Sequence, residues 1–153
     1  MNLPPDVASF LACRRIAVVG VSHDTKQPAN LIFRKLKANG HEAFAVNPTA
    51  QELEGARSYP NLASVPPPVE AVMIVTHPNI SSDIVREAAG LGIKQFWFHR
   101  SFGDGSVSAG AIEACRAAGI TPIVGGCPMM YVEPDFGHVC MRWMLKLSHK
   151  VPG

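Results

Sequence analysis

The stretch Arg15-Ile16-Ala17-Val18-Val19-Gly20-Val21-Ser22-His23-Asp24-Thr25-Lys26 decides the fold that this sequence predicts. Residues 15–20 form an apolar run that ends in glycine, which is typical of a strand buried on both faces of a parallel sheet. A short loop follows, and Pro28 then suits the first turn of a helix that we expect to run to about Asn39. A strand, a loop and a helix in this order open an α/β fold.

The same alternation continues along the chain. We expect further strands at 42–46, 71–76, 95–98 and 121–124, helices after the third and fourth strands, and a final helix at 139–147. Residues 49–68 are rich in turn formers and predict an irregular segment. Each of three helices ends in a glycine that is followed closely by a strand, as in the αβ loops of βαβ units. The sequence therefore predicts a single-domain, doubly wound α/β fold, with a five-stranded, mainly parallel sheet and helices on both faces.

Length and composition limit the function classes. A chain of 153 residues fits one domain, and 47% hydrophobic with 17% charged residues is a globular composition. The formal net charge of +2 is too small to indicate a nucleic-acid partner. The apolar runs are too short to span a bilayer and the N-terminus has no signal-like pattern, so we expect a cytoplasmic protein without membrane contact. The cysteines lack metal-site spacing, so we expect reduced, mostly buried thiols and no metal.

Ligands of a parallel α/β sheet bind beyond the carboxyl ends of the strands, so the loops at those ends form the candidate site. In the first loop Gly20 permits close backbone approach, while Ser22 offers a hydroxyl and Lys26 a charge to a phosphate. This loop has neither the G-x-G-x-x-G nor the Walker pattern, so a plain turn is the alternative. Asn47 stands where a nicotinamide-binding fold usually has an acid, and it suits either a phosphorylated ribose or a simple Asn-Pro turn.

The remaining loops leave similar alternatives open. His77 would donate to a phosphate or face solvent, and Phe98 would face the cleft or pack in the core. Arg100 follows the fourth expected strand and suits a phosphate contact. Cys127 is either a thiol near the ligand or a structural cysteine. The sequence lacks paired carboxylates at these strand ends, H-E-x-x-H and G-x-S-x-G, so it indicates a binding site without evident catalytic machinery.

The order and spacing of several motifs resemble those of the small CoA-binding domain proteins. These look like the isolated N-terminal Rossmann-like domain of the succinyl-CoA synthetase alpha subunit. The most specific parts are G-V-S-x-x-x-K at 20–26, Val46-Asn47-Pro48 and Gly92-Ile93-Lys94 with Trp97. The resemblance covers residues 10–131 and implies a Rossmann-like domain there, with 132–153 as a C-terminal helical extension packed on the same domain.

The resemblance also implies a ligand, coenzyme A or an acyl-CoA. Its 3′-phospho-ADP part would lie across the first loops and its pantetheine arm along the strand ends. Relatives usually carry a Q-P-G-like turn after the tryptophan strand, where this chain has His-Arg-Ser-Phe-Gly at 99–103. The synthetase's ligase domain and its phosphorylated histidine have no counterpart in so short a chain. The cofactor-binding residues that we expect are Gly20, Val21, Ser22, Lys26, Asn47, Pro48, Thr76, His77, Pro78, Phe98, His99, Arg100 and Cys127.

Three function classes fit these observations. The first is a non-catalytic CoA-binding protein that acts as carrier, sensor or partner subunit. The second, an NAD(P)-using oxidoreductase, is disfavoured by the missing glycine fingerprint and by Asn47. The third is a redox or interaction module in which Cys127 forms a mixed disulfide with a thiol. Apolar segments at 95–98, 129–131 and 143–147 would serve a homodimer, a protein partner or ordinary core packing.

Overall fold

Strand β1 (Arg15–Val19) lies in the middle of the sheet, as its apolar sequence predicted. It pairs in parallel with β2 on one side and with β5 on the other. The structure, a computed structural model, describes residues 3–100, 105–149 and 151–152. The other strands are β2 (Glu42–Val46), β3 (Glu52–Leu53), β4 (Ala56–Tyr59), β5 (Ala71–Ile74), β6 (Gln95–Phe98) and β7 (Ile123–Val124). The α-helices are α1 (Pro5–Ala12), α2 (Pro28–Ala38), α3 (Pro78–Gly90), α4 (Ala109–Ala117) and α5 (Phe136–Leu147), and short 3₁₀ turns are η1 (Leu62–Ser64) and η2 (Pro128–Met130).

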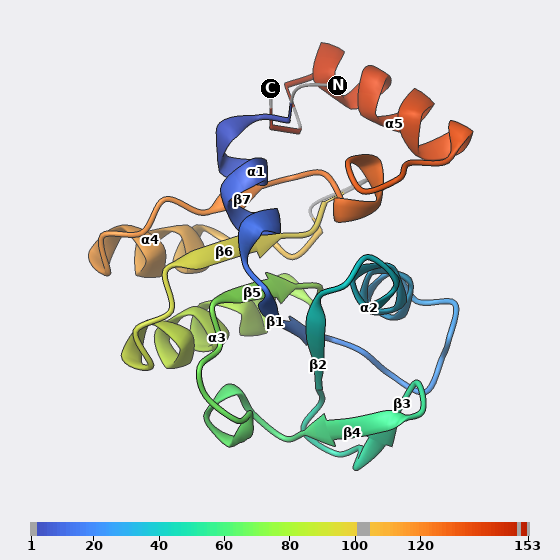
Figure 1. Ribbon diagram of the computed structural model, residues 1–153. Coiled ribbons are helices and arrows are strands. Elements are labelled where there is room, and N and C mark those ends of the chain that lie inside the picture. The colour runs from blue at the N-terminus through green and yellow to red at the C-terminus, as the bar shows by residue number, and fades with distance from the viewer. Residues whose placement is uncertain (1–2, 101–104, 150, 153) are drawn as a thin grey trace.

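The described residues form a seven-stranded sheet instead of the five-stranded one that we predicted, in the order β3-β4-β2-β1-β5-β6-β7 (Figure 1). The two additional strands, β3 and β4, lie in the segment predicted to be irregular. β4 pairs in parallel with β2, while β3 pairs antiparallel with β4, so the sheet is mixed but mostly parallel. The sequence hides them because β3 has two residues and β4 has no apolar run. Without β3, the strand order is that of a Rossmann fold.

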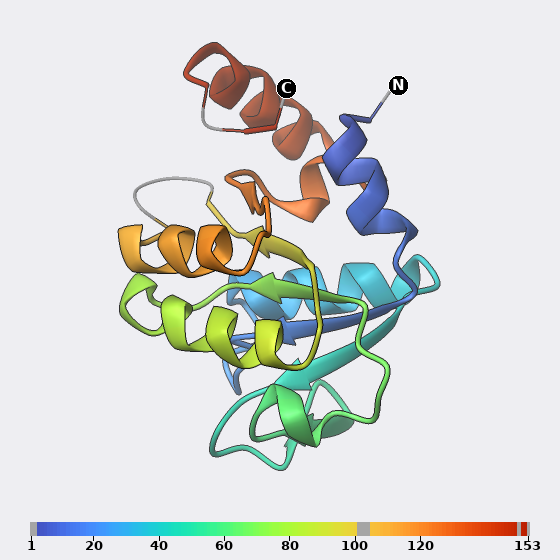
Figure 2. The same ribbon diagram turned by 90° about the vertical axis from the view of Figure 1, so that its left-hand side faces the viewer.

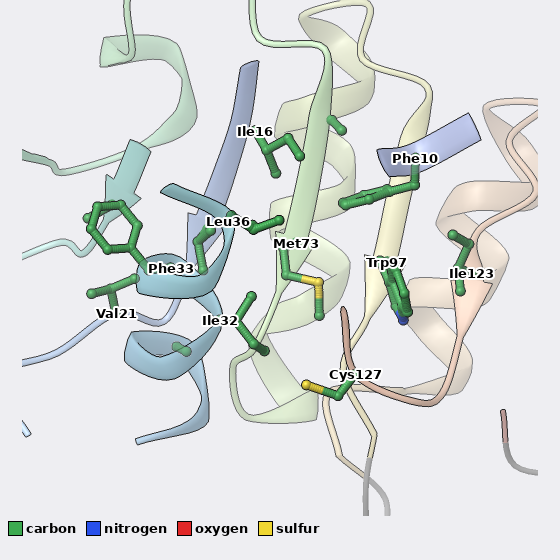
Figure 3. Close-up of a cluster of buried hydrophobic side chains, with 14 of the residues drawn as sticks. Phe10, Ile16, Val21, Ile32, Phe33, Leu36, Met73, Trp97, Ile123 and Cys127 are labelled. Carbon is green, nitrogen blue, oxygen red and sulfur yellow. The ribbon is translucent and has the colours of Figure 1, made fainter. Parts of the chain in front are cut away.

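Side chains of β1 point alternately into two hydrophobic cores. Ile16 and Val18 belong to the core beneath α1 and α2, whereas Ala17 and Val19 belong to the core beneath α3 and α4. Helices therefore cover both faces of the sheet, as predicted (Figures 1 and 2). Figure 3 shows the first core, in which Trp97 from β6 lies near Phe10 from α1. The two rings are 5.3 Å apart, and Trp97 Nε1 donates to the Gly125 carbonyl at 2.8 Å.

The structure adds detail on three helices that the sequence did not supply. Helix α1 was not expected, although Pro5 begins it and Val7 and Phe10 are fully buried. Helix α3 begins at Pro78, and its N-cap is His77, whose side chain accepts the Asn79 N–H. Helix α5 begins three residues earlier than predicted, because Asp135 caps it by accepting the His138 N–H. Within the described ranges, none of the helices is long and apolar enough to cross a membrane.

Gly20 lies where the main chains of β1 and β5 approach each other. Its φ is +113°, and a Cβ added there would lie 2.2 Å from the Val75 carbonyl oxygen. Any other residue would combine an unfavourable backbone conformation with an overlap against main chain, which cannot rotate away. The glycine that ends β1 is therefore required by the fold, independently of any ligand.

We expect Gly20→Ala to lower the free energy of unfolding by about 3 kcal/mol or more, because backbone strain and overlap add. Gly40→Ala is the matched control, since Gly40 has φ +87° but nothing within 4 Å of its added Cβ. The control should cost only about 1 kcal/mol. Urea unfolding followed by circular dichroism measures both. Equal losses for the two variants would contradict the overlap at Gly20.

Candidate functional site

The loops that follow β1, β2 and β4 meet at one edge of the sheet, and Asn47 ties them together. Its Nδ2 donates to the Val21 carbonyl at 2.9 Å, and its backbone N–H donates to the Tyr59 carbonyl at 2.9 Å. Its Oδ1 accepts the N–H groups of Thr49 at 2.9 Å and Ala50 at 3.1 Å. The amide group of Asn47 is thus engaged by the protein itself. In the structure, the Asn47 side chain holds the loops in place.

The loop after β1 is fastened by Asn30, which is fully buried in the first turn of α2. Asn30 Nδ2 donates to the Ser22 carbonyl at 2.7 Å, and its Oδ1 accepts the Ser22 N–H at 3.0 Å. Nδ2 also donates to Glu54 Oε1 at 2.7 Å, and Arg34 Nη1 donates to the same oxygen at 2.7 Å. These bonds lower the pKa of Glu54, that from Asn30 most. The β3–β4 turn is therefore attached to the loop after β1.

Asp24 accepts hydrogen bonds inside the loop that we expected to receive a phosphate. Its Oδ1 accepts the Lys26 N–H at 3.1 Å, and its Oδ2 accepts Gln27 Nε2 at 3.0 Å. The Lys26 N–H, and then the Gln27 side chain, lower the pKa of Asp24. The Ser22 hydroxyl, expected to face a phosphate, accepts the Asp24 N–H at 3.3 Å. A carboxylate thus lies just ahead of α2, where helix amides favour an anion.

The loop after β5 leads directly into α3. Thr76 Oγ1 lies 3.3 Å from the hydroxyl of Ser81, which is buried and donates to the Ser106 carbonyl at 2.7 Å. His77 Nδ1 accepts the Asn79 N–H at 3.4 Å, and Pro78 is the first residue of α3. Because β5 pairs in parallel with β1, the three expected residues 76–78 lie at the same edge of the sheet as Gly20.

The residues after β6 differ in their surroundings. Burial lowers the pKa of His99 to about 4, so this imidazole is neutral near pH 7. Arg100 N–H donates to the Gly126 carbonyl at 3.1 Å, which joins the loops after β6 and β7. Within the turn 99–103 that we expected to differ from the family pattern, residues 101–103 lie outside the described residues.

Three expected site residues have their side chains inside the hydrophobic cores. Phe98 is fully buried beneath α3 and α4, as the core alternative proposed. Val21 is fully buried and Cys127 is 4% exposed in the opposite core (Figure 3). In contrast, Lys26 and Pro48 are exposed. The structure thus brings the loops of the expected residues together but separates buried from accessible side chains.

A small apolar cavity of about 160 Å³ opens between the ends of β1 and β2, the segment after β4, and α3. It lies beside Pro48, and its walls are Val19, Val46, Pro48, Pro60, Asn61, Leu62, Ile80, Ile84 and Glu87. Two further cavities beside the loops have a more polar lining. One, of about 490 Å³, is lined by Ser22, His23, Thr25 and residues 52–55, and the other, of about 510 Å³, by residues 48–51, Arg57, Ser58 and Pro60.

Sequence reasoning missed Arg57 and Ser58, which lie on β4 and line the larger polar cavity. The exposed Arg57 guanidinium lies 5.2 Å from the centre of the Tyr59 ring. The Ser58 hydroxyl is buried and has no hydrogen-bond partner within the described part of the chain. A strand assignment for 56–59 would have placed this cation near the same edge as Asn47.

Comparison with known proteins bears on what this edge binds. A family model described as a CoA binding domain matches residues 14–133. An ADP-forming acetate–CoA ligase II of Archaeoglobus fulgidus is 29% identical over 92 residues, 59% of this chain but only 14% of the ligase. The uncharacterized protein YneT of Bacillus subtilis is 25% identical over 114 residues, which cover 74% of this chain and 82% of YneT. A hypothetical protein from Pyrococcus horikoshii has a similar structure, with a TM-score of 0.73, 25% identity and coverage of 84% of this chain and 93% of that one.

The burial of Cys127 predicts that its thiol reacts slowly with alkylating reagents. Burial raises the pKa of Cys127 to about 12, so at pH 8 the reactive thiolate is a small fraction of the folded protein and grows only as the pH rises. We expect iodoacetamide to alkylate Cys127 at least about 100-fold more slowly in native than in urea-unfolded protein. Peptide mass spectrometry over time measures this. Similar rates in both states would restore Cys127 as a candidate redox residue.

Proposed function

Since the chain belongs to the CoA-binding domain family, we propose that it binds coenzyme A or an acyl-CoA through the loops at the carboxyl edge of its sheet. One observation carries this proposal. The loop with the G-V-S-x-x-x-K pattern leads into the N-terminus of α2 and borders a polar cavity at that edge. Coenzyme A presents three phosphate groups on one flexible ligand, and a helix N-terminus with nearby cations suits its nucleotide end.

In this proposal the nucleotide lies over the loops after β1 and β2. Lys26 is exposed just before α2, and Arg57 is exposed on β4, so both cations are accessible to a ligand. A guanidinium can hold two phosphate oxygens at once, whereas an ammonium acts as a point charge. The apolar cavity beside Pro48 suits the flat adenine ring, because both the ring and the cavity walls lose contact with water when the ring binds.

The pantetheine arm runs from there towards Thr76, His77 and His99, over the ends of β5 and β6. The neutral imidazole of His99 suits the uncharged amides of this arm better than it suits a phosphate. The buried thiol of Cys127 does not favour a mixed disulfide with the ligand.

We infer a carrier, sensor or partner-subunit role without catalysis, in the cytoplasm. The accessible charged residues that the structure describes at this edge, Lys26 and Arg57, are suited to binding a phosphate. The described cysteines are free thiols, which fits a reducing compartment. Since the matched region spans 14% of the archaeal ligase, activity of the whole ligase is not part of the proposal.

Isothermal calorimetry with coenzyme A in reducing buffer tests the proposal. We expect saturable binding at sub-millimolar ligand, and Lys26→Ala should weaken it by about 1–3 kcal/mol, or roughly fivefold to 150-fold. Lys94→Ala is the matched control, because Lys94 is exposed just before β6 at the opposite edge of the sheet. No heat with coenzyme A, or binding of NADPH alone, would reject the proposed function.

Asp24 gives a second, opposite prediction. Because its carboxylate takes the amide of Lys26, a phosphate has to displace it, and Asp24→Asn should tighten coenzyme A binding by about threefold to tenfold. Asp83→Asn is the control, since the exposed Asp83 pairs with Arg86 on α3 and should leave the affinity unchanged. Calorimetry on folded variants measures both. Unchanged or weaker binding by Asp24→Asn would show that this carboxylate does not compete with the ligand.

A further inference from the structure

Helix α5 carries large apolar side chains that the rest of the described chain leaves uncovered. Phe136 is 85% exposed, Trp143 65% and Leu147 69%. Figures 1 and 2 show α5 beyond the β7 side of the sheet, near the chain termini. Monomeric proteins rarely expose aromatic and aliphatic residues in such a continuous patch.

The opposite side of α5 attaches the helix to the protein. Arg142 is buried, and its Nη1 donates to the Met130 carbonyl at 3.0 Å. Leu145 is 6% exposed and packs in the core beneath α1 and α2. The helix is therefore anchored in a fixed orientation, with its apolar side directed away from the sheet.

The exposed apolar residues form one stripe along the helix. Phe136, Cys140, Trp143 and Leu147 follow spacings of four, three and four residues, which is the seam of a helix that packs against another helix. Val139 and Met144 are also exposed and widen the stripe. The six positions carry no charge, so contact between two such stripes would bury no ion.

The stripe is symmetric when the helix is reversed. Rotation about the middle of α5 exchanges Phe136 with Leu147, Val139 with Met144, and Cys140 with Trp143. An antiparallel second copy would therefore meet an apolar residue opposite every apolar residue. This is the condition for a twofold interface, in which the same surface serves both partners.

Charges at the helix ends favour the same arrangement. Asp135 is exposed at the N-terminus of α5, whereas Lys146 and His149 are exposed near its C-terminus. An antiparallel pairing brings the acidic end of one helix next to the basic end of the other. It also places the two helix dipoles in opposite directions.

We propose that two copies of this chain form a homodimer in which α5 packs antiparallel against α5 of the second copy. The CoA proposal plays no part in it, and the carboxyl edge beside β1 and β2 stays uncovered in both copies. A single helix pair buries a small interface, so we expect a weak dimer with a Kd on the order of 10 µM.

Sedimentation equilibrium of the full chain, reduced, from about 2 to 200 µM tests the proposal. We expect a monomer of 16.4 kDa at low concentration and a dimer at high concentration. Trp143→Asp should weaken dimerisation at least tenfold and keep the circular dichroism spectrum, because the side chain is exposed. Leu91→Asp, on an exposed residue that follows α3, is the control and should dimerise like the wild type. A monomer at 200 µM, or a dimer that survives Trp143→Asp, would overturn the proposal.

Disulfide trapping tests the orientation. In a Cys140→Ser background, Phe136→Cys combined with Leu147→Cys should give a covalent dimer under mild oxidation, and neither single substitution should do so. Trapping through either single substitution would indicate a parallel pairing and overturn the antiparallel one. Cosedimentation with vesicles of phosphatidylcholine and phosphatidylglycerol (3:1) covers the other source of apolar contact. Vesicle binding by a chain that stays monomeric, lost in Trp143→Asp, would assign the stripe to lipid and reject the dimer.

Discussion

Burial of β1 on both faces is the constraint on which the rest of the structure depends. Its side chains alternate between two cores, so a shift by one residue would exchange every contact beneath the flanking helices. Parallel pairing with β2 and β5 then fixes where their carboxyl ends lie. The edge that gathers the candidate binding loops is thus a consequence of core packing. Gly20 serves both the packing of the sheet and the geometry of this edge, because the close main-chain contact with Val75 demands glycine there.

Most polar side chains at that edge hold the loops in place. Asn30 and Asn47 each use several hydrogen bonds to hold loops, and Asp24 satisfies amides that a ligand anion would otherwise take. Exposed cations remain around this framework. A phosphate would therefore meet loops that are already organised, and the exchange of one carboxylate for another anion would cost less than ordering a mobile loop.

The fold was largely predictable from the sequence because short apolar runs, bounded by glycine, proline or asparagine turns, mark the expected strands. β3 and β4 escaped prediction, since a two-residue strand has no period and β4 depends on its pairing with β2 for its identity. Helix α1 was not predicted, because a segment of eight residues that begins in a proline pair is equally compatible with a terminal coil. At the site, strand-end positions were predictable, but the direction of each side chain was not. Phe98 and Val21 point into cores, while Arg57 is accessible on a strand that the sequence did not reveal.

Trp97 links α1, β6 and the loop after β7 through its contact with Phe10 and its bond to Gly125. The chain has two tryptophans, and the other, Trp143, is exposed on α5. Their indole rings sit in a dry and a wet environment, so intrinsic fluorescence divides into a blue-shifted emission that tracks the interior and a red-shifted, iodide-quenchable emission that tracks the outer helix. Loosening of the interior and events on the surface can therefore be followed separately in one unlabelled sample.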